Sequence, residues 1–134
     1  MFDSLEIGAS ALTAQRIRMD TIAGNVANMN TTRNAQGQPI PYRRRFVVFA
    51  PGAPDDSSRA GVRVARVEVD RSPFQRRYEP GHPDADRDGY VLFPNIDLAI
   101  EQVNMLEATR AYEANVTMIE TTKAMITATL RLIA

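Results

Sequence analysis

The residues best suited to chemistry form an acidic run in the second half of the chain. Asp84, Asp86 and Asp88 alternate and are followed by Gly89, as in the first half of a calcium-binding loop. The twelfth position of such a loop would be Asn95 instead of a bidentate glutamate, and calcium takes about six to eight oxygens. An acidic turn is therefore the favoured interpretation. The alternative is a calcium-binding interaction module through Asp84, Asp86 and Asp88.

His82 is the only histidine, and it lies two residues before Asp84 in a turn rich in proline and glycine. A His–Asp pair could act as a general base, but the chain has no cysteine and no serine in a nucleophile-elbow pattern. A structural role for His82 is therefore favoured. We expect no enzyme activity, no catalytic residue, no cofactor and no bound metal.

Three consecutive arginines, Arg43 to Arg45, are the strongest candidate for a nucleic-acid contact. The chain carries 16 basic and 16 acidic residues, so its net charge favours neither a polyanion nor a membrane surface. A charged edge strand that discourages pairing is the favoured interpretation. No apolar run is long enough to span a membrane, and the N-terminus lacks the regions of a cleaved secretory signal.

The element that dominates the pattern is the segment from residue 95 to residue 134, which contains no glycine and no proline. Apolar residues recur there every seven positions, which predicts one long helix with a wide apolar stripe, capped by Asn95. The helix would be about 55–60 Å long, too long to bury its stripe within so short a chain. We therefore expect it to pack against neighbouring molecules through Leu98, Met105, Tyr112, Val116, Ile119, Ile126, Leu130 and Ile133.

A second helix is predicted from residue 3 to about residue 29, with small residues that allow close approach of another helix. Its apolar residues also recur in sevens, and the expected packing residues are Leu5, Leu12, Met19, Ile22 and Val26. Asparagines and threonines after residue 25 predict its end. Because a central module joins the two helices, we expect them to lie antiparallel, in a coiled-coil-like arrangement.

Residues 31–94 predict a loop followed by a small β module of three or four strands. The candidates are residues 42–50, 61–70, 74–78 and 90–93, with a bulge at Ala65–Arg66 where the apolar alternation slips. The fold class is therefore α+β, with a terminal helical domain formed by residues 1–30 and 95–134. We expect the chain ends to lie far from the β module. The surplus turns of the longer helix should pack against the module at its start, or residues 28–34 should run extended beside it.

Motifs at both ends of the chain resemble one protein family. Residues 9–16 (ASALTAQR) and 25–28 (NVAN) are similar to the N-terminal signature of flagellar basal-body rod and hook proteins, and residues 107–115 (EATRAYEAN) are similar to their C-terminal signature. Residues 80–86 (PGHPDAD) resemble the middle of a short proximal-rod member. The family positions are Asn25, Asn28, Gly81, His82, Asp84, Asp86, Arg110, Tyr112 and Asn115.

This resemblance implies that the chain is a structural subunit of the proximal rod. The alternative is that it is another short flagellar rod subunit. It implies a hollow helical shaft that transmits torque and lines an export channel, with the terminal helices on the inside. The implied partners are copies of the chain itself, other rod proteins, basal-body ring and adaptor components, and the flagellar type III export apparatus. The implied location is the rod that crosses the periplasm, reached without a cleaved signal peptide.

Overall fold

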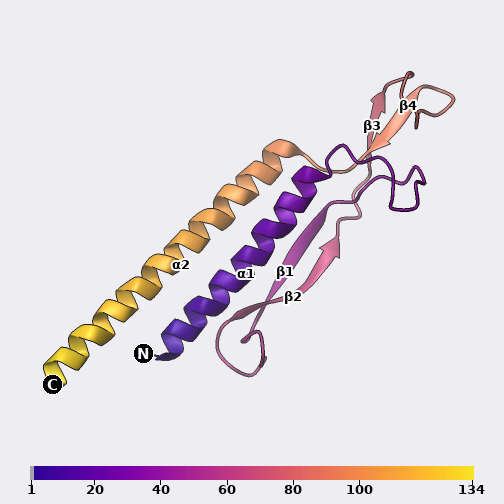
Figure 1. The fold of residues 1–134 in the computed structure, drawn as a ribbon. Helices are drawn as coiled ribbons and strands as arrows, with labels where there is room; N and C mark the ends of the chain where they lie inside the picture. Colours follow the sequence, from indigo (N-terminus) through magenta and orange to yellow (C-terminus); the bar gives the residue numbers. More distant parts are fainter. Residues whose placement is uncertain (1) are drawn as a thin grey trace.

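The computed structural model describes residues 2–134, which contain two long helices and four short strands. In chain order these are α1 (Phe2–Ala27), β1 (Arg45–Pro51), β2 (Val62–Val69), β3 (Gln75–Tyr78), β4 (Tyr90–Phe93) and α2 (Leu98–Ile133). The helices run antiparallel, and the strands lie between them in the chain (Figure 1). The predicted α+β class with long terminal helices is confirmed.

The register of the helix pair places the start of α2 level with the end of α1. Gly8 faces Ile119 near one end of the pair, and Asn25 lies 3.4 Å from Glu101 near the other. Because α2 has 36 residues and α1 has 26, the surplus turns of α2 project past the start of α1 (Figure 1). The expectation that these turns lie against the β module is wrong, because buried contacts tie the first turn of α2 to the last turn of α1.

β1 and β2 form an antiparallel hairpin with one irregularity in its register. Val48 pairs with Arg66 but Phe49 pairs with Val64, so Ala65 is an extra residue on β2. An extra residue on one strand is a β-bulge, which bends the hairpin and increases its twist. The bulge predicted at this position is confirmed.

The β1–β2 hairpin lies along α1, so that α1 is sandwiched between the hairpin and α2 (Figure 1). The Val62 N–H donates to Ser10 Oγ at 3.1 Å, and Arg59 pairs with Glu6. The hairpin loop therefore lies beside the start of α1, so the expectation that the chain ends lie far from the strands is wrong for the N-terminal end. The C-terminal end of α2 lies away from both hairpins, as expected (Figure 1). A two-stranded hairpin is marginal in water by itself, and packing on a helix provides the apolar cover it needs.

β3 and β4 form a second antiparallel hairpin at the opposite end of the molecule (Figure 1). The two hairpins share no strand pairing, so the expected single module of three or four strands is instead two separate hairpins. The second hairpin buries its own small core of Val91, Phe93 and Ile96. Each hairpin therefore finds separate apolar cover, and nothing forces them into one sheet.

The N-cap of α2 is Asp97, whose side chain accepts a hydrogen bond from the Ala99 N–H at 3.0 Å. The prediction of Asn95 as the cap is wrong. Asn95 Oδ1 accepts from the Arg44 N–H, while its Nδ2 donates to the carbonyls of Asp70 and Ser72. These bonds hold residue 95 in the connection, so the helix begins after Asp97.

The two helices approach each other closely at Gly8. A Cβ at this position would lie 2.8 Å from Ile119 Cγ1 and 2.9 Å from Met118 Cε. At Gly24, on the same helix, the nearest atom to an added Cβ is the Tyr42 hydroxyl at 3.9 Å. Gly8 therefore permits the helix contact, whereas Gly24 has room for a methyl group.

We expect Gly8→Ala to destabilise the protein by about 1 kcal/mol, because overpacking outweighs the gain in helix propensity. Gly24→Ala should stabilise it by about 0.5–1 kcal/mol, because only the propensity gain applies. Thermal unfolding of both variants, followed by far-UV circular dichroism, checks the difference. Equal stabilisation by both substitutions would contradict the close approach at Gly8.

Candidate assembly interface

α2 leaves most of its surface open to solvent. Only Glu101 and Ala108 are buried among its 36 residues. A set of large apolar side chains is exposed instead, namely Leu98, Ile100, Val103, Leu106, Met118, Met125, Leu130, Leu132 and Ile133. Large exposed apolar patches on soluble proteins typically mark surfaces that bind another molecule. None of the described helices is long and apolar enough to cross a membrane.

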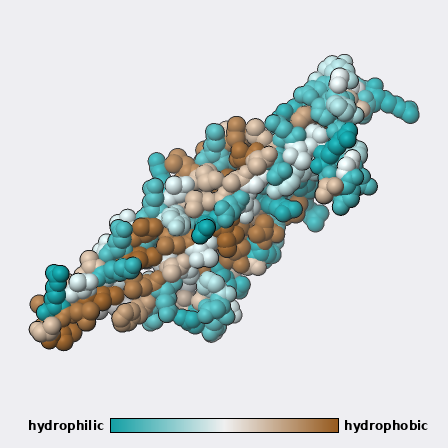
Figure 2. Space-filling view, in the orientation of Figure 1, coloured by the Kyte–Doolittle hydropathy of each residue, from teal (hydrophilic) through white to brown (hydrophobic). Residues whose placement is uncertain are grey.

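The exposed apolar residues of α2 fall into two groups with a polar stretch between them. We call Leu98, Ile100, Val103 and Leu106 the proximal patch, and Met118, Met125, Leu130, Leu132 and Ile133 the distal patch. The exposed residues between them include Glu107, Arg110, Glu113 and Thr117. Figure 2 shows apolar residues gathered at the free end of α2 and again near its start. The two ends of α2 are therefore the candidate contact surfaces.

The residues predicted for subunit packing divide into three classes. Ile22 is buried between the helices, and Leu98, Leu130 and Ile133 are exposed. The remainder are half-buried: Leu5, Leu12, Met19, Val26, Met105, Tyr112, Val116, Ile119 and Ile126. One neighbouring helix thus covers only part of the predicted stripe.

An apolar groove lies between the end of α1 and the start of α2. It has a volume of about 410 Å³ and is lined by Ile22, Ala23, Val26, Ala27, Leu98, Glu101, Gln102 and Met105. Four of these residues, Ile22, Val26, Leu98 and Met105, belong to the predicted packing set. The groove gives that set a defined shape at this end of the molecule.

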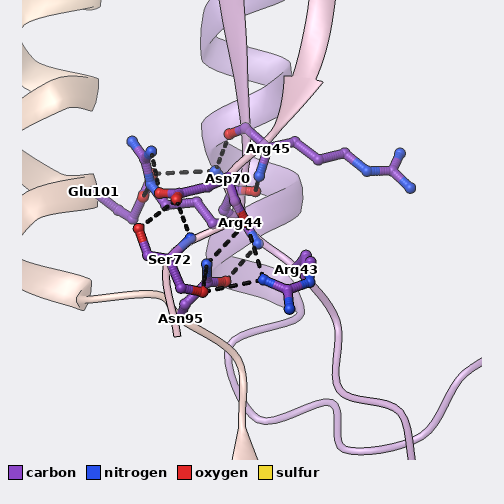
Figure 3. Close-up of polar contacts among 8 residues, drawn as sticks. Arg43, Arg44, Arg45, Asp70, Ser72, Asn95 and Glu101 are labelled. Carbon is purple, nitrogen blue, oxygen red and sulfur yellow. Dashed lines mark hydrogen bonds and ion pairs between the residues drawn. The ribbon is translucent and has the colours of Figure 1, made fainter. Parts of the chain in front are cut away.

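A buried polar cluster adjoins this groove and joins four segments of the chain (Figure 3). We call it the polar junction, and it comprises Asn25, Arg44, Asp70, Asn95 and Glu101. Glu101 and Asn25 are both 0% exposed. Arg44 Nε donates to Glu101 Oε1, and Arg44 Nη1 lies 3.4 Å from Asp70 Oδ2. A carboxylate without solvent is tolerated only when it is paired in this way.

Asn25 connects the polar junction to the first strand. Its Nδ2 donates to the Arg45 carbonyl at 2.7 Å, and its Oδ1 accepts from the Arg45 N–H at 2.9 Å. Asn25 thus bonds both backbone groups of Arg45, as a neighbouring strand would. The pair fixes where β1 begins relative to the end of α1.

Asp70 closes the junction on the side of β2. The Ser72 hydroxyl and backbone N–H donate to its carboxylate and, together with Arg44, hold the pKa of Asp70 below its ordinary value, against the opposing effect of burial. Asp70 therefore stays ionised beside Arg44. Its carboxylate and that of Glu101 both pair with the half-buried guanidinium of Arg44.

The arginine run does not form an open basic surface. Arg43 Nη1 donates to the carbonyls of Asp70 and Ser72, and its guanidinium lies 4.1 Å from the centre of the Phe74 ring. Arg44 is held in the polar junction, and only Arg45 is exposed. Two of the three charges on which the nucleic-acid hypothesis depends, those of Arg43 and Arg44, are therefore engaged within the chain. The edge-strand interpretation is wrong as well, because β1 begins at Arg45 and the first two arginines precede it.

Glu101 is the key residue that the sequence pattern did not single out as a packing residue. It stands three residues after Leu98 and four before Met105, so it occupies the apolar stripe. A charged residue in such a stripe is the signal that could have identified it. Its partner Asn25 lies in the other motif segment, but nothing in the spacing pairs the two.

The acidic residues of the calcium hypothesis point to separate partners. Asp84 accepts hydrogen bonds from the Thr32 hydroxyl and from Arg33 Nε, each at 2.8 Å. Asp86 Oδ1 accepts from the N–H groups of Asp88 and Tyr90, which closes its own turn. Within residues 2–134 no three His, Asp or Glu side chains gather closely enough to hold a metal ion. The geometry therefore favours an acidic turn over a calcium module.

His82 has a structural place in the same turn. Its Nδ1 accepts a hydrogen bond from the Asp84 N–H at 3.0 Å, and its ring meets Phe93 edge to face. Gly81, beside it, is exposed and has open space around it. The contact between His82 and Asp84 is thus a turn contact through the backbone, which agrees with the favoured structural role of His82.

The remaining family positions lie on the two helices. Asn28 Nδ2 donates to the Gly24 carbonyl, which ends α1 as predicted. Asn115 Nδ2 donates to the Ala111 carbonyl within α2. Tyr112 is half-buried on the same helix, and Arg110 is exposed in its polar middle. These positions are therefore spread along the molecule and form no common site.

We expect Glu101→Gln to destabilise the protein by about 2–4 kcal/mol. The substitution removes the charge that pairs with Arg44 and sets an amide donor against Asn25 Nδ2. Glu107→Gln is the matched control, because Glu107 is largely exposed and its contact with Arg18 spans 3.6 Å, so the change should be within about 0.5 kcal/mol. Urea denaturation measures both. Equal effects would show that the polar junction carries no particular weight.

Asp84 predicts an acid-dependent loss of stability. Hydrogen bonds from Arg33, above all, and from Thr32 hold the pKa of Asp84 below its ordinary value of 3.8. A lowered pKa in the folded state stabilises the protein above the unfolded value, and this stability is lost as the pH falls through the folded one. We therefore expect Asp84→Asn to lower the melting temperature at pH 7, and the difference from wild type to vanish well below pH 4.

Asp88→Asn is the control for this titration, because Asp88 is exposed and lies outside the Arg33 pair. Its melting temperature should follow that of the wild type at every pH. Scanning calorimetry between about pH 2 and pH 7 measures all three proteins. A constant gap between wild type and Asp84→Asn across that range would rule out the proposed titration.

Comparison with known proteins places both ends of the chain in one family. Residues 5–36 match the family described as "Flagella basal body rod protein", and residues 87–132 match "Flagellar basal body rod FlgEFG protein C-terminal". These matches cover α1 with the following loop, and β4 with nearly all of α2. They include the helix faces, the apolar groove and most of the polar junction.

Curated relatives match over almost the full length. The "Flagellar basal-body rod protein FlgC" of Borreliella burgdorferi is 40% identical, covering 99% of this chain and 97% of the relative. Those of Bacillus subtilis and Escherichia coli O6:H1 are 43% and 42% identical, covering 93% and 98% of this chain and 93% and 97% of the relatives. The chain therefore belongs to the FlgC family of flagellar basal-body rod proteins.

Proposed function

We propose that this chain is a structural subunit of the flagellar basal-body rod, which assembles through the exposed faces of its terminal helices. The observation that carries the proposal is the surface of α2, where only two of 36 residues are buried and large apolar side chains face solvent. Burying apolar surface is the main favourable term in most protein association. The names of the relatives, which are rod proteins, agree with this role.

The layer order supports a particular orientation in the assembly. The β1–β2 hairpin covers one side of α1, and α2 lies on the other side with its outer face free (Figure 1). In a tube built from these subunits, α2 then lies in the inner layer of helices. The two hairpins lie on the outer side of that layer. Heterologous contacts that do not close produce such helical assemblies.

The role is structural rather than catalytic in this proposal. The groups that could have carried chemistry have structural partners. Asp84 accepts a hydrogen bond from Arg33, and His82 accepts one from the Asp84 N–H. The finer inferences follow from the family alone. The subunit forms part of a hollow shaft that crosses the periplasm, transmits torque and surrounds an export channel. It reaches that site through the flagellar type III export apparatus and contacts copies of itself, other rod proteins, and ring and adaptor components.

The residues predicted for subunit packing acquire two roles in this assembly. Ile22 and the half-buried residues, apart from Ile126 near the free end of α2, hold the helix pair together within one subunit and present their outer edges to neighbours. The exposed ones, Leu98, Leu130 and Ile133, serve contacts between subunits. The proximal patch adds Val103 and Leu106 to this second group.

Motility tests this proposal most directly. In cells whose native gene is replaced by one that encodes Leu106→Asp, we expect swimming to be abolished. The reason is that a charge in the proximal patch would have to be buried in the assembled rod. Leu106 is 52% exposed, so the isolated subunit should keep its fold. Swimming in soft agar and electron microscopy of isolated basal bodies are the measurements.

The matched control is Thr117→Asp, which places the same charge in the exposed polar middle of α2. It should leave swimming within about twofold of wild type, because a solvated charge costs little. Far-UV circular dichroism of both purified variants checks that neither loses helix. Normal rods with Leu106→Asp, or full motility in a strain lacking this gene, would refute the assembly role.

A further inference from the structure

One arginine of the first hairpin has a partly buried side chain and no acceptor. Arg63 lies near the start of β2, and its Nε is buried without a hydrogen-bond partner. Among the contacts within residues 2–134, none joins the Arg63 guanidinium to an acceptor or to an aromatic ring. A guanidinium is always charged in proteins, and a charge that leaves water is ordinarily paired. The missing acceptor of Arg63 therefore needs an explanation.

The other partly buried arginines within residues 2–134 all have acceptors. Arg18 and Arg44 each pair with a glutamate on α2. Arg43 donates to two backbone carbonyls. The remaining arginines in this part of the chain are exposed, so water can solvate their charge. The unmet guanidinium of Arg63 is thus a feature of its own site and not of the fold as a whole.

Arg63 lines a cavity between α1 and the start of β2. The cavity has a volume of about 150 Å³ and is lined also by Ser10, Thr13 and Ile17 of α1 and by Pro54 of the hairpin loop. None of the described residues that line it is acidic. One water takes up about 30 Å³, so the space admits a small ion with a few waters. It is too small for a nucleotide or another ligand of drug size.

We propose that this cavity binds a small oxyanion of the phosphate or sulfate type, held by the guanidinium of Arg63. The N–H groups of arginine form a planar fork that matches two oxygens of such an ion. Water in the cavity would satisfy the N–H donors but would leave the positive charge without a counter-ion. An oxyanion satisfies the donors and the charge together.

The bound ion would tie the first hairpin to α1. Ser10 has no donor to spare, because its hydroxyl already donates to a carbonyl of its own helix. The Thr13 hydroxyl donates to the Ala9 carbonyl at 3.2 Å on an exposed part of α1, so it can turn toward the ion instead. An ion held by Arg63 and Thr13 would bridge β2 and α1 within one subunit. This site is independent of the rod role and of every contact between subunits.

Thermal unfolding of the purified full-length chain tests the site, with inorganic phosphate as the probe. Sodium phosphate should raise the melting temperature by about 2–4 °C over sodium chloride of equal ionic strength, because a ligand of the folded state stabilises it by mass action. Arg63→Gln should abolish this rise. Arg66→Gln is the matched control on the same strand, because Arg66 is 60% exposed and pairs with Glu68. It should keep the rise.

Phosphorus NMR of the wild-type protein gives a second readout that needs no variant. Binding should broaden the phosphate signal, and added sulfate should reverse the broadening by competing for the same site. If Arg63→Gln fails to fold by circular dichroism, Arg63→Lys takes its place and should weaken the phosphate response, since an ammonium group lacks the fork.

Two outcomes would overturn the proposal. An equal rise in melting temperature for wild type, Arg63→Gln and Arg66→Gln would reveal a general effect of phosphate on the protein. No rise and no broadening with wild type would show that the cavity holds only water. Both measurements use the isolated subunit, so either failure leaves the assembly role untouched.

Discussion

The buried carboxylate of Glu101 is the constraint on which the rest of the structure depends. It has no contact with solvent, so its charge must be met by Arg44 and Asn25. Arg44 precedes β1, Asn25 lies in the last turns of α1 and Glu101 lies in the first turns of α2. Satisfying one charge therefore positions three elements at once. Hydrogen bonds are directional and apolar contacts are not, so this junction sets the register that the helix stripes alone leave open.

That register decides where the unpaired surface of the molecule lies. With the start of α2 held level with the end of α1, the surplus turns of α2 have nothing beside them and their apolar side chains face water. If α2 were displaced along α1 toward the β3–β4 hairpin, α1 would cover the C-terminal turns of α2 and leave its N-terminal turns exposed. The same few polar groups thus set the register of the helix pair and the shape of its contact surfaces.

The hairpins and turns show how residues suited to chemistry become structural. Asp84 faces Arg33 and Thr32, Asp86 closes its own turn, and His82 accepts a backbone N–H. Each of these groups forms its hydrogen bonds within the chain. The bonds from Thr32 and Arg33 to Asp84 join the loop after α1 to the β3–β4 hairpin. The motif spacing that resembles a calcium loop also suits a tight acidic turn, because both use closely spaced side-chain oxygens. In a calcium loop these oxygens bind the ion, whereas in this turn they accept from nearby N–H groups.

The sequence by itself determined the two helices, the four strands, the bulge at Ala65 and the excess of apolar surface on α2, because these follow from local periodicity and turn residues. Tertiary structure alone decided that Glu101 is buried against Arg44 and Asn25, that Asp97 caps α2 in place of Asn95, and that the strands form two hairpins. It also decided which end of α2 projects. The physical reason is that these features depend on contacts between residues far apart in the chain, whose pairing no periodicity encodes. A charged residue in an apolar stripe indicates that a buried partner exists, but it does not indicate which residue that partner is.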